Sequence, residues 1–239
     1  MWGLYGWLLA KGQIAFINNI PDTTVGYVTI YPEIYRGNFT NAKKVVRYLL
    51  NYPGVMGMRV LGPQEPLVLG EGDIVYTFSE IYNKDPYKVD SDHIMFLPIC
   101  NLSVFKVTNK GKRTKKCKFI GKGRDLGLPE TEGLFTIDRQ FANDQARLTD
   151  YLNECEVMYS YDNNSAMFEI ARLCGCRVVI IPSIYTKEEF AKYEPGMNGI
   201  SYGLEEEVPL DAAEFRSHYQ GMIKTFENRL EEFIDETQT

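Results

Sequence analysis

The chain has 239 residues, of which 44% are hydrophobic and 13% aromatic, and this content excludes a disordered chain because it can build a sizeable core. The formal net charge of -6 disfavours nucleic acid as the main partner, since neutralising phosphates needs an excess of Lys and Arg. The five cysteines form no CxxC motif, and no pair of histidines accompanies them. These features argue against a disulfide framework and structural zinc, and they favour a reducing, cytoplasmic environment.

The first half of the chain alternates predicted helices and strands. The apolar residues 2–10 are expected to form a helix and not a signal peptide, because they have no basic leader and no small-residue cleavage site. A second helix is predicted at residues 41–52, where Val45, Val46 and Leu49 recur at helical spacing. Short β-branched or aromatic runs predict strands at residues 13–18, 26–31, 73–78 and 93–99.

The second half repeats this alternation more clearly. Strands are predicted at residues 117–120, 134–138, 156–160 and 177–182, and helices at residues 142–153 and 165–174. A terminal amphipathic helix is expected because Phe226, Leu230 and Phe233 lie at helical spacing among acidic residues. No apolar run is long enough to cross a bilayer. The alternation predicts an α/β fold of parallel sheets covered by helices, arranged as two Rossmann-like lobes.

A basic stretch divides the two series of elements. Residues 106–124 hold nine basic side chains and no acidic one, and residues 101–116 are the expected linker. The predicted lobes are therefore 1–100 and 114–239, with the terminal helix either in the second lobe or returning to the first. The basic run is best explained as a solvated linker, and the alternative is an anion site at its far end, at Lys122 and Arg124.

The most informative segment is residues 156–182, which predicts one strand–helix–strand unit. Its turn consists of Asp162, Asn163, Asn164 and Ser165, which are small polar residues at the carboxyl end of a strand and can cap the helix. Ligands bind parallel sheets outside the carboxyl ends of the strands, and free backbone N–H groups there favour an anion such as a diphosphate. Glu169, about one turn into the helix, could reach a ribose. The alternative is a simple helix cap with a surface carboxylate.

This segment resembles the donor-nucleotide segment of GT-B glycosyltransferases. The similarity rests on the polar turn, Glu169, Ala171, residues 174–176 and Val178-Val179, and the segment 118–124 is similar to the first strand of the C-terminal lobe. The segments 31–38 and 45–54 resemble a bacterial polysaccharide-associated branch of these enzymes. The resemblance implies that Glu169 holds the ribose, and that Lys122, Arg124 and the 162–165 turn face the diphosphate. It also implies a GT-B-like fold with a truncated N-terminal lobe.

The function implied is transfer of a sugar from a nucleotide sugar to a glycan or lipid-linked acceptor, with no cofactor besides the donor substrate. Peripheral membrane association is left open, and the sequence does not decide between inversion and retention. The alternatives are a non-catalytic nucleotide-binding partner protein of the same fold and a nucleotide-sugar epimerase.

Two acidic positions remain. Glu33 ends the apolar strand at residues 26–31 and is the candidate catalytic residue on the acceptor side, the alternative being a turn carboxylate beside Pro32. Asp90-Ser91-Asp92 matches the DxD motif of metal-binding sites. A metal-binding DxD follows an apolar strand, whereas this one precedes an apolar segment, so we expect its carboxylates to lie in a turn. No metal site is predicted.

Overall fold

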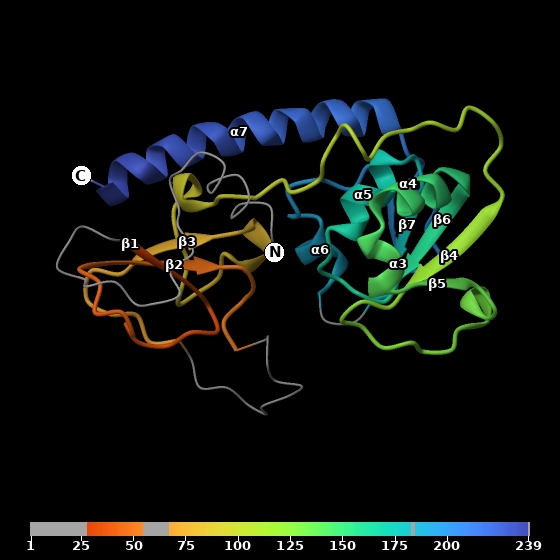
Figure 1. The fold of residues 1–239 in the computed structure, drawn as a ribbon. Coiled ribbons are helices and arrows are strands. Elements are labelled where there is room, and N and C mark those ends of the chain that lie inside the picture. The colour runs from red at the N-terminus through yellow and green to blue at the C-terminus, as the bar shows by residue number, and fades with distance from the viewer. Residues whose placement is uncertain (1–27, 55–66, 183–184, 239) are drawn as a thin grey trace. The chain divides into compact units, whose positions relative to one another are not determined.

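The computed structural model describes residues 28–54, 67–182 and 185–238, which form two compact units (Figure 1). Unit 1 comprises the chain up to Pro98 together with residues from Met222 onward, and unit 2 comprises Ile99–Gly221. The segments 2–10 and 13–18, predicted as a helix and a strand, lie outside the described residues. No described helix has the length and apolar character needed to cross a membrane.

Unit 1 contains a three-stranded parallel sheet in the order β1-β2-β3. The strands are β1 (Val28–Pro32), β2 (Lys44–Leu49) and β3 (Ile74–Thr77). The central strand β2 pairs with both neighbours, from Val28↔Lys44 on one side to Leu49↔Thr77 on the other. The strand predicted at residues 73–78 is therefore present, and the sheet is parallel as the alternation of elements predicted.

The helix predicted at residues 41–52 is wrong, because this segment forms strand β2. Val45, Val46 and Leu49 are buried, and so is Tyr48 between them. A central strand of a parallel sheet is covered on both faces and therefore carries apolar residues in succession, without the alternation of a half-exposed strand. Such a run contains positions three and four residues apart by necessity, and these mimic a helical stripe.

The strand predicted at residues 93–99 is also wrong. Residues Ser91–His93 form a 3-10 helix, and a second short helix of this type spans Glu80–Tyr82. Only Ile94 bridges to β3, at Thr77. The next carbonyl, that of Met95, accepts a hydrogen bond from the Tyr48 hydroxyl at 2.6 Å, so the segment turns to side-chain partners where a strand would continue.

The terminal helix α7 (Ala212–Gln238) packs its last turns on the sheet of unit 1. Its ring Phe233 lies 5.1 Å from the ring of Tyr76, centroid to centroid, in an edge-on arrangement. Of the two placements predicted for the terminal helix, the return to the first lobe is the one found from Met222 onward, where the chain belongs to unit 1. The cause is one shared apolar cluster, whose buried members are Val46, Tyr48, Tyr76, Met95, Phe226, Leu230 and Phe233.

Replacing Phe233 by Ala should loosen unit 1. Deleting a buried aromatic ring leaves a cavity and costs about 3 to 4 kcal/mol of unfolding free energy. We expect faster amide hydrogen exchange in β2 and β3, measured by mass spectrometry. The matched control is Glu231→Ala on the exposed side of the same helix, which should leave exchange in these strands unchanged. Equal exchange rates in both variants would show that α7 does not stabilise this sheet.

Unit 2 contains a five-stranded parallel sheet in the order β5-β4-β6-β7-β8. Each of the strands predicted in this half is present within a few residues of its expected bounds. The strands are β4 (Lys115–Phe119), β5 (Phe135–Ile137), β6 (Cys155–Ser160), β7 (Arg177–Ile180) and β8 (Ile200–Tyr202). Together with unit 1, this makes the chain an α/β protein with two all-parallel sheets.

The helices of unit 2 connect these strands. The single helix predicted at residues 142–153 is two helices, because Asp138 caps the first and Asp144 caps the second with their side chains. The helices are α3 (Arg139–Asn143), α4 (Gln145–Glu154), α5 (Met167–Leu173) and α6 (Lys187–Phe190), and a 3-10 helix spans Pro129–Thr131. The unit β6–α5–β7 is the strand–helix–strand unit predicted for residues 156–182.

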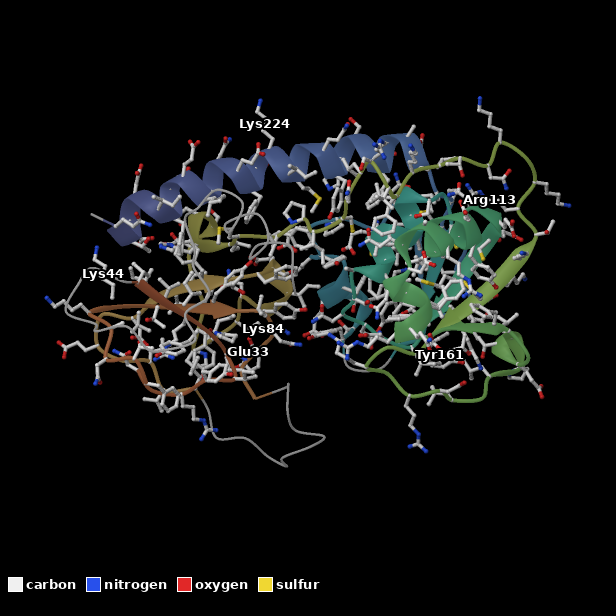
Figure 2. The ribbon with its side chains drawn as sticks, in the orientation of Figure 1. Glu33, Lys44, Lys84, Arg113, Tyr161 and Lys224 are labelled. Atoms are coloured by element: carbon white, nitrogen blue, oxygen red, sulfur yellow. The ribbon has the colours of Figure 1, made fainter. Side chains whose placement is uncertain are left out.

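The basic segment 101–116 is not a solvated linker, since it belongs to unit 2 and ends in strand β4. Phe105 within it is buried. The backbone N–H groups of Thr108 and Asn109 both donate to the side-chain oxygen of Asn153, at 2.7 and 3.1 Å. Arg113, labelled in Figure 2, donates to the carbonyl of Leu152 at 3.0 Å. The backbone of the segment and the side chain of Arg113 are thus fixed to the end of α4.

Candidate functional site

The candidate site lies at the carboxyl edge of the sheet in unit 2. Strands β4 and β6 are adjacent and parallel, with Phe119 paired to Ser160 at their carboxyl ends. The loop that follows β4 and the turn that follows β6 therefore leave the sheet at the same edge. The first residue of that turn, Tyr161, donates its N–H to the carbonyl of Phe119 at 2.9 Å. Tyr161 is labelled in Figure 2.

Asp162 joins these two segments. One oxygen of its carboxylate accepts the backbone N–H of Lys122 at 3.0 Å, and the other accepts the N–H of Asn164 at 3.0 Å. The side chain of Asp162 is buried, so both hydrogen bonds are shielded from water. The structure thus brings together Lys122 and the 162–165 turn, which are 40 residues apart in the sequence.

Two glycines allow this close approach. Gly121 has a φ of +52°, and a Cβ built on it would overlap the Asp162 carboxylate. A Cβ on Gly123 would overlap the backbone carbonyl of Tyr161. A carbonyl in a paired segment cannot move aside as a flexible side chain can. Both positions therefore require glycine for the loop to lie against the turn.

The segment 118–124 carries three cationic side chains. Lys118 is paired with Asp125 at 2.7 Å, and this ammonium group together with the Gly127 N–H lowers the pKa of the Asp125 carboxyl group. The side chains of Lys122 and Arg124 are exposed at the edge of the sheet. Two cationic residues thus follow β4 beside the polar turn, as an anion site at the far end of the basic run requires.

The polar groups of the 162–165 turn make more hydrogen bonds within the protein than the sequence indicated. The side-chain amide of Asn163 donates to the carbonyl of Ile181, after β7, at 3.3 Å. Ser165 accepts the N–H of Met167 at 3.2 Å, and Asp162 accepts the N–H of Asn164. The backbone N–H groups of Asn164 and Met167 are therefore not free, contrary to the expectation from the sequence. The positive side chains of the loop are the main attraction for an anion here.

Glu169 lies inside unit 2 and is not a surface carboxylate, being only 2% exposed. One of its oxygens accepts a hydrogen bond from the Tyr193 hydroxyl. Its other oxygen, Oε2, has no hydrogen-bond partner among the described residues. An unpaired buried carboxylate oxygen is costly, and such atoms are uncommon in folded proteins.

Arg172, three residues further along α5, balances the charge of Glu169. Its Nη1 donates to the carbonyls of Gly196 and Asn198 at 2.8 and 3.0 Å, and its guanidinium lies 3.9 Å from the ring centroid of Phe215. Burial lowers its pKa to about 10, so Arg172 stays charged at neutral pH. The spacing of Glu169 and Arg172 was visible in the sequence, but their common burial was not.

Burial raises the pKa of Glu169, and the nearby Arg172 opposes this effect only in part. A carboxyl group with a raised pKa in the folded state binds its proton more tightly there than in the unfolded chain. Its contribution to stability is then present at low pH and lost as pH rises above the ordinary value of 4.5 toward the folded-state pKa. Ionisable groups with lowered pKa values, such as Glu188, act in the opposite direction.

We therefore expect the unfolding free energy of the wild type to fall as pH rises above 4.5, and that of the Glu169→Gln variant to fall less. The difference in unfolding free energy, variant minus wild type, should increase as pH is raised from 4.5 toward neutrality. The measurement is a series of thermal or urea unfolding curves across this range. Glu188→Gln is the control, and its difference should not increase with pH. A Glu169→Gln difference that stays constant would mean that burial does not perturb this carboxyl group.

Glu33 lies in unit 1, just past the end of β1, and Figure 2 shows it at the other end of the sheet from Lys44, which begins β2. Its buried carboxylate accepts the N–H of Leu50, past the end of β2, at 3.0 Å. Glu33 thus links the carboxyl ends of two parallel strands. Its catalytic role stays a prediction.

The remaining polar candidates form no metal centre. Asp90 and Asp92 flank the first residue of a 3-10 helix, and Asp92 lies 3.4 Å from Nδ1 of His93. His218 contacts the carbonyl of Glu194 at 3.0 Å. Within the part of the chain that the structure describes, no group of three or more His, Cys, Asp or Glu residues is placed to hold a metal ion.

Comparison with known proteins adds no relative: no family model matches the chain, and no curated protein or solved structure matches it significantly.

The glycine requirement at the edge of the sheet can be tested without a ligand. Gly123→Ala should displace the loop from the turn and lower the stability of unit 2 by about 2 kcal/mol or more, because the new methyl group overlaps a backbone carbonyl. Exchange of the Lys122 amide hydrogen, now bonded to Asp162, should become faster. Gly221→Ala in α7, where a Cβ meets open space, should leave both quantities unchanged or raise stability. Slow exchange in Gly123→Ala would show that the loop does not depend on this contact.

Proposed function

We propose that the chain is a nucleotide-sugar-dependent glycosyltransferase of GT-B type and that unit 2 binds the donor. The observation that carries the proposal is the contact of the loop after β4 with the turn after β6. This contact brings the backbone of Lys122 to the 162–165 turn at the carboxyl edge of a parallel sheet, and Arg124 follows two residues later. Such edges are where open α/β sheets bind nucleotides. The sequence resemblance gives the two segments the corresponding roles.

In this proposal the donor diphosphate lies against Lys122 and Arg124. These cations would neutralise the charge that grows on the diphosphate as the sugar departs, which is a direct way to lower the barrier of transfer. Asp162 holds the loop through the Lys122 N–H and is a positioning residue with no part in binding the phosphates. The site needs no metal ion, because the basic side chains supply the positive charge.

The ribose of the donor is proposed to donate a hydroxyl group to Oε2 of Glu169. This oxygen has no partner among the described residues, and a ligand hydroxyl would satisfy it. Because Glu169 is only 2% exposed, a ribose reaches the oxygen only if the side chains that cover it move aside. Tyr193 already fixes the carboxylate through its other oxygen, which leaves Oε2 as the acceptor. Glu33 is retained as the proposed acceptor-side residue, and the acceptor is proposed to be a glycan or lipid-linked sugar.

Titration calorimetry with a panel of nucleoside diphosphates tests this proposal. Lys122→Ala and Arg124→Ala should each weaken diphosphate binding by about tenfold, since each removes a charge-assisted contact, and should affect nucleoside binding much less. The matched controls are Lys110→Ala and Lys112→Ala, which remove exposed cations from the same basic run. Binding should persist in EDTA. Equal, strongly salt-dependent effects at all four positions would contradict a fixed phosphate site.

Incubation with labelled nucleotide sugars separates the activities. Hydrolysis or transfer of the sugar supports the glycosyltransferase. Binding without turnover would identify a non-catalytic partner protein, and an epimeric sugar formed without acceptor would identify an epimerase. Glu169→Gln should weaken binding of both nucleoside and nucleoside diphosphate, because a ribose contact is common to the two.

A further inference from the structure

Unit 1 carries a group of exposed apolar side chains on two loops, one after β1 and one before β3. Apolar side chains as exposed as these are unusual when several lie on neighbouring loops, and such groups mark interaction surfaces. Val68 has the largest exposed fraction among them, 77%. The members of this apolar group are Ile34, Tyr35, Phe39, Val68 and Leu69, with exposed fractions of 60, 49, 66, 77 and 36%.

A cavity of about 470 Å³ lies between the same two loops. The first loop contributes Arg36, Asn38 and Lys43 to its wall, and the second contributes Val68 and residues 69–73. Apolar and cationic groups therefore meet in one place. A cavity of this size can hold the phosphate of a lipid headgroup with part of its glycerol.

Arg47 joins the two loops through hydrogen bonds, so a buried side chain fixes their position relative to each other. This buried side chain donates to the carboxylate of Asp73 at 2.7 Å and to the carbonyl of Gly37 at 2.8 Å. Asp73 in turn accepts the N–H of Gly70 at 2.9 Å. The ion pair with Arg47 balances the charge of Asp73. Glu71 is the other acidic residue that lines the cavity.

The first of the two loops is cationic, whereas the second carries Glu71 and Asp73, of which Asp73 is paired with Arg47. Residues 34–44 contain Arg36, Lys43 and Lys44 and no acidic residue, although the chain carries a net charge of -6. A surface that combines exposed apolar side chains with cations suits the interface of an anionic bilayer. There the apolar groups enter the headgroup–acyl boundary and the cations meet lipid phosphates. A fluid bilayer can accommodate apolar side chains from two loops, whereas a protein partner would need a matching rigid surface.

We propose that the loops 34–44 and 68–73 of unit 1 dock on an anionic lipid bilayer, with a lipid phosphate in the cavity beside Arg36 and Lys43. The apolar side chains Ile34, Phe39 and Val68 insert into the interface. The inference concerns unit 1 alone and does not rest on the proposed donor site. Nucleotide binding by unit 2 and bilayer binding by unit 1 can therefore fail independently.

Co-sedimentation of the full chain with vesicles tests the proposal. Binding is expected to phosphatidylcholine vesicles that contain about one third phosphatidylglycerol, and much less to phosphatidylcholine alone. The double variant Ile34→Ser, Val68→Ser should lower partitioning about tenfold, and Lys43→Glu should do the same. Glu71→Lys should strengthen it. The matched controls Leu126→Ser and Lys110→Glu change an exposed apolar residue and an exposed cation of unit 2, and they should bind vesicles as the wild type does.

Three results would overturn the proposal. One is the absence of binding to the anionic vesicles. A second is binding that the loop variants and the unit 2 controls reduce equally, which would indicate general electrostatic adsorption. The third is saturable binding of glycerol 3-phosphate or inorganic phosphate, lost in Lys43→Glu, by a protein that ignores vesicles, which would identify a soluble phosphate ligand. Circular dichroism of each variant shows that the fold is retained, as expected for substitutions at exposed positions.

Discussion

The carboxylate of Asp162 sets the geometry of the candidate site, because it accepts N–H groups from two segments that meet only in the folded chain. The loop after β4 has no regular structure of its own, and its backbone near Lys122 is held by this contact. The contact forms only if the backbones approach closely, which requires Gly121 and Gly123. A buried, doubly bonded carboxylate and two glycines thus convert an edge of the sheet into a surface with fixed cations.

In unit 1 a buried cation joins two loops, as the buried anion Asp162 does in unit 2. Arg47 is buried in strand β2, and its guanidinium donates to groups of two loops, including Asp73 and the carbonyl of Gly37. In both units a buried ionic side chain joins two loops through hydrogen bonds, because loops lack the regular backbone ladder that fixes strands. Removing either side chain would leave several buried polar groups unpaired, so the loops and their exposed side chains would lose their common position.

The sequence predicted the second half of the fold better than the first. In residues 156–182 the strand, turn and helix differ in composition, so the bounds of β6, α5 and β7 follow from the pattern. The pattern did not predict strand β2, because burial on both faces removes the alternation of apolar and polar residues that distinguishes a strand. Val45, Val46 and Leu49 then fit the spacing of a helix. For the candidate site, the sequence identified Lys122 and the turn. It could not show that Glu169 is buried against Tyr193, since that depends on tertiary packing.

The basic run shows why charge in a sequence does not by itself locate a binding site. A count of nine cations between residues 106 and 124 is compatible with both a solvated linker and an anion site, and it favours the linker. The structure separates them by their partners: Arg113 donates to the end of α4, and Lys118 is paired with Asp125. A cation whose charge is already balanced by a neighbour adds little attraction for a ligand. The position of Lys122 follows from its main-chain N–H, which Asp162 holds, so this site depends as much on a buried anion as on the exposed cations beside it.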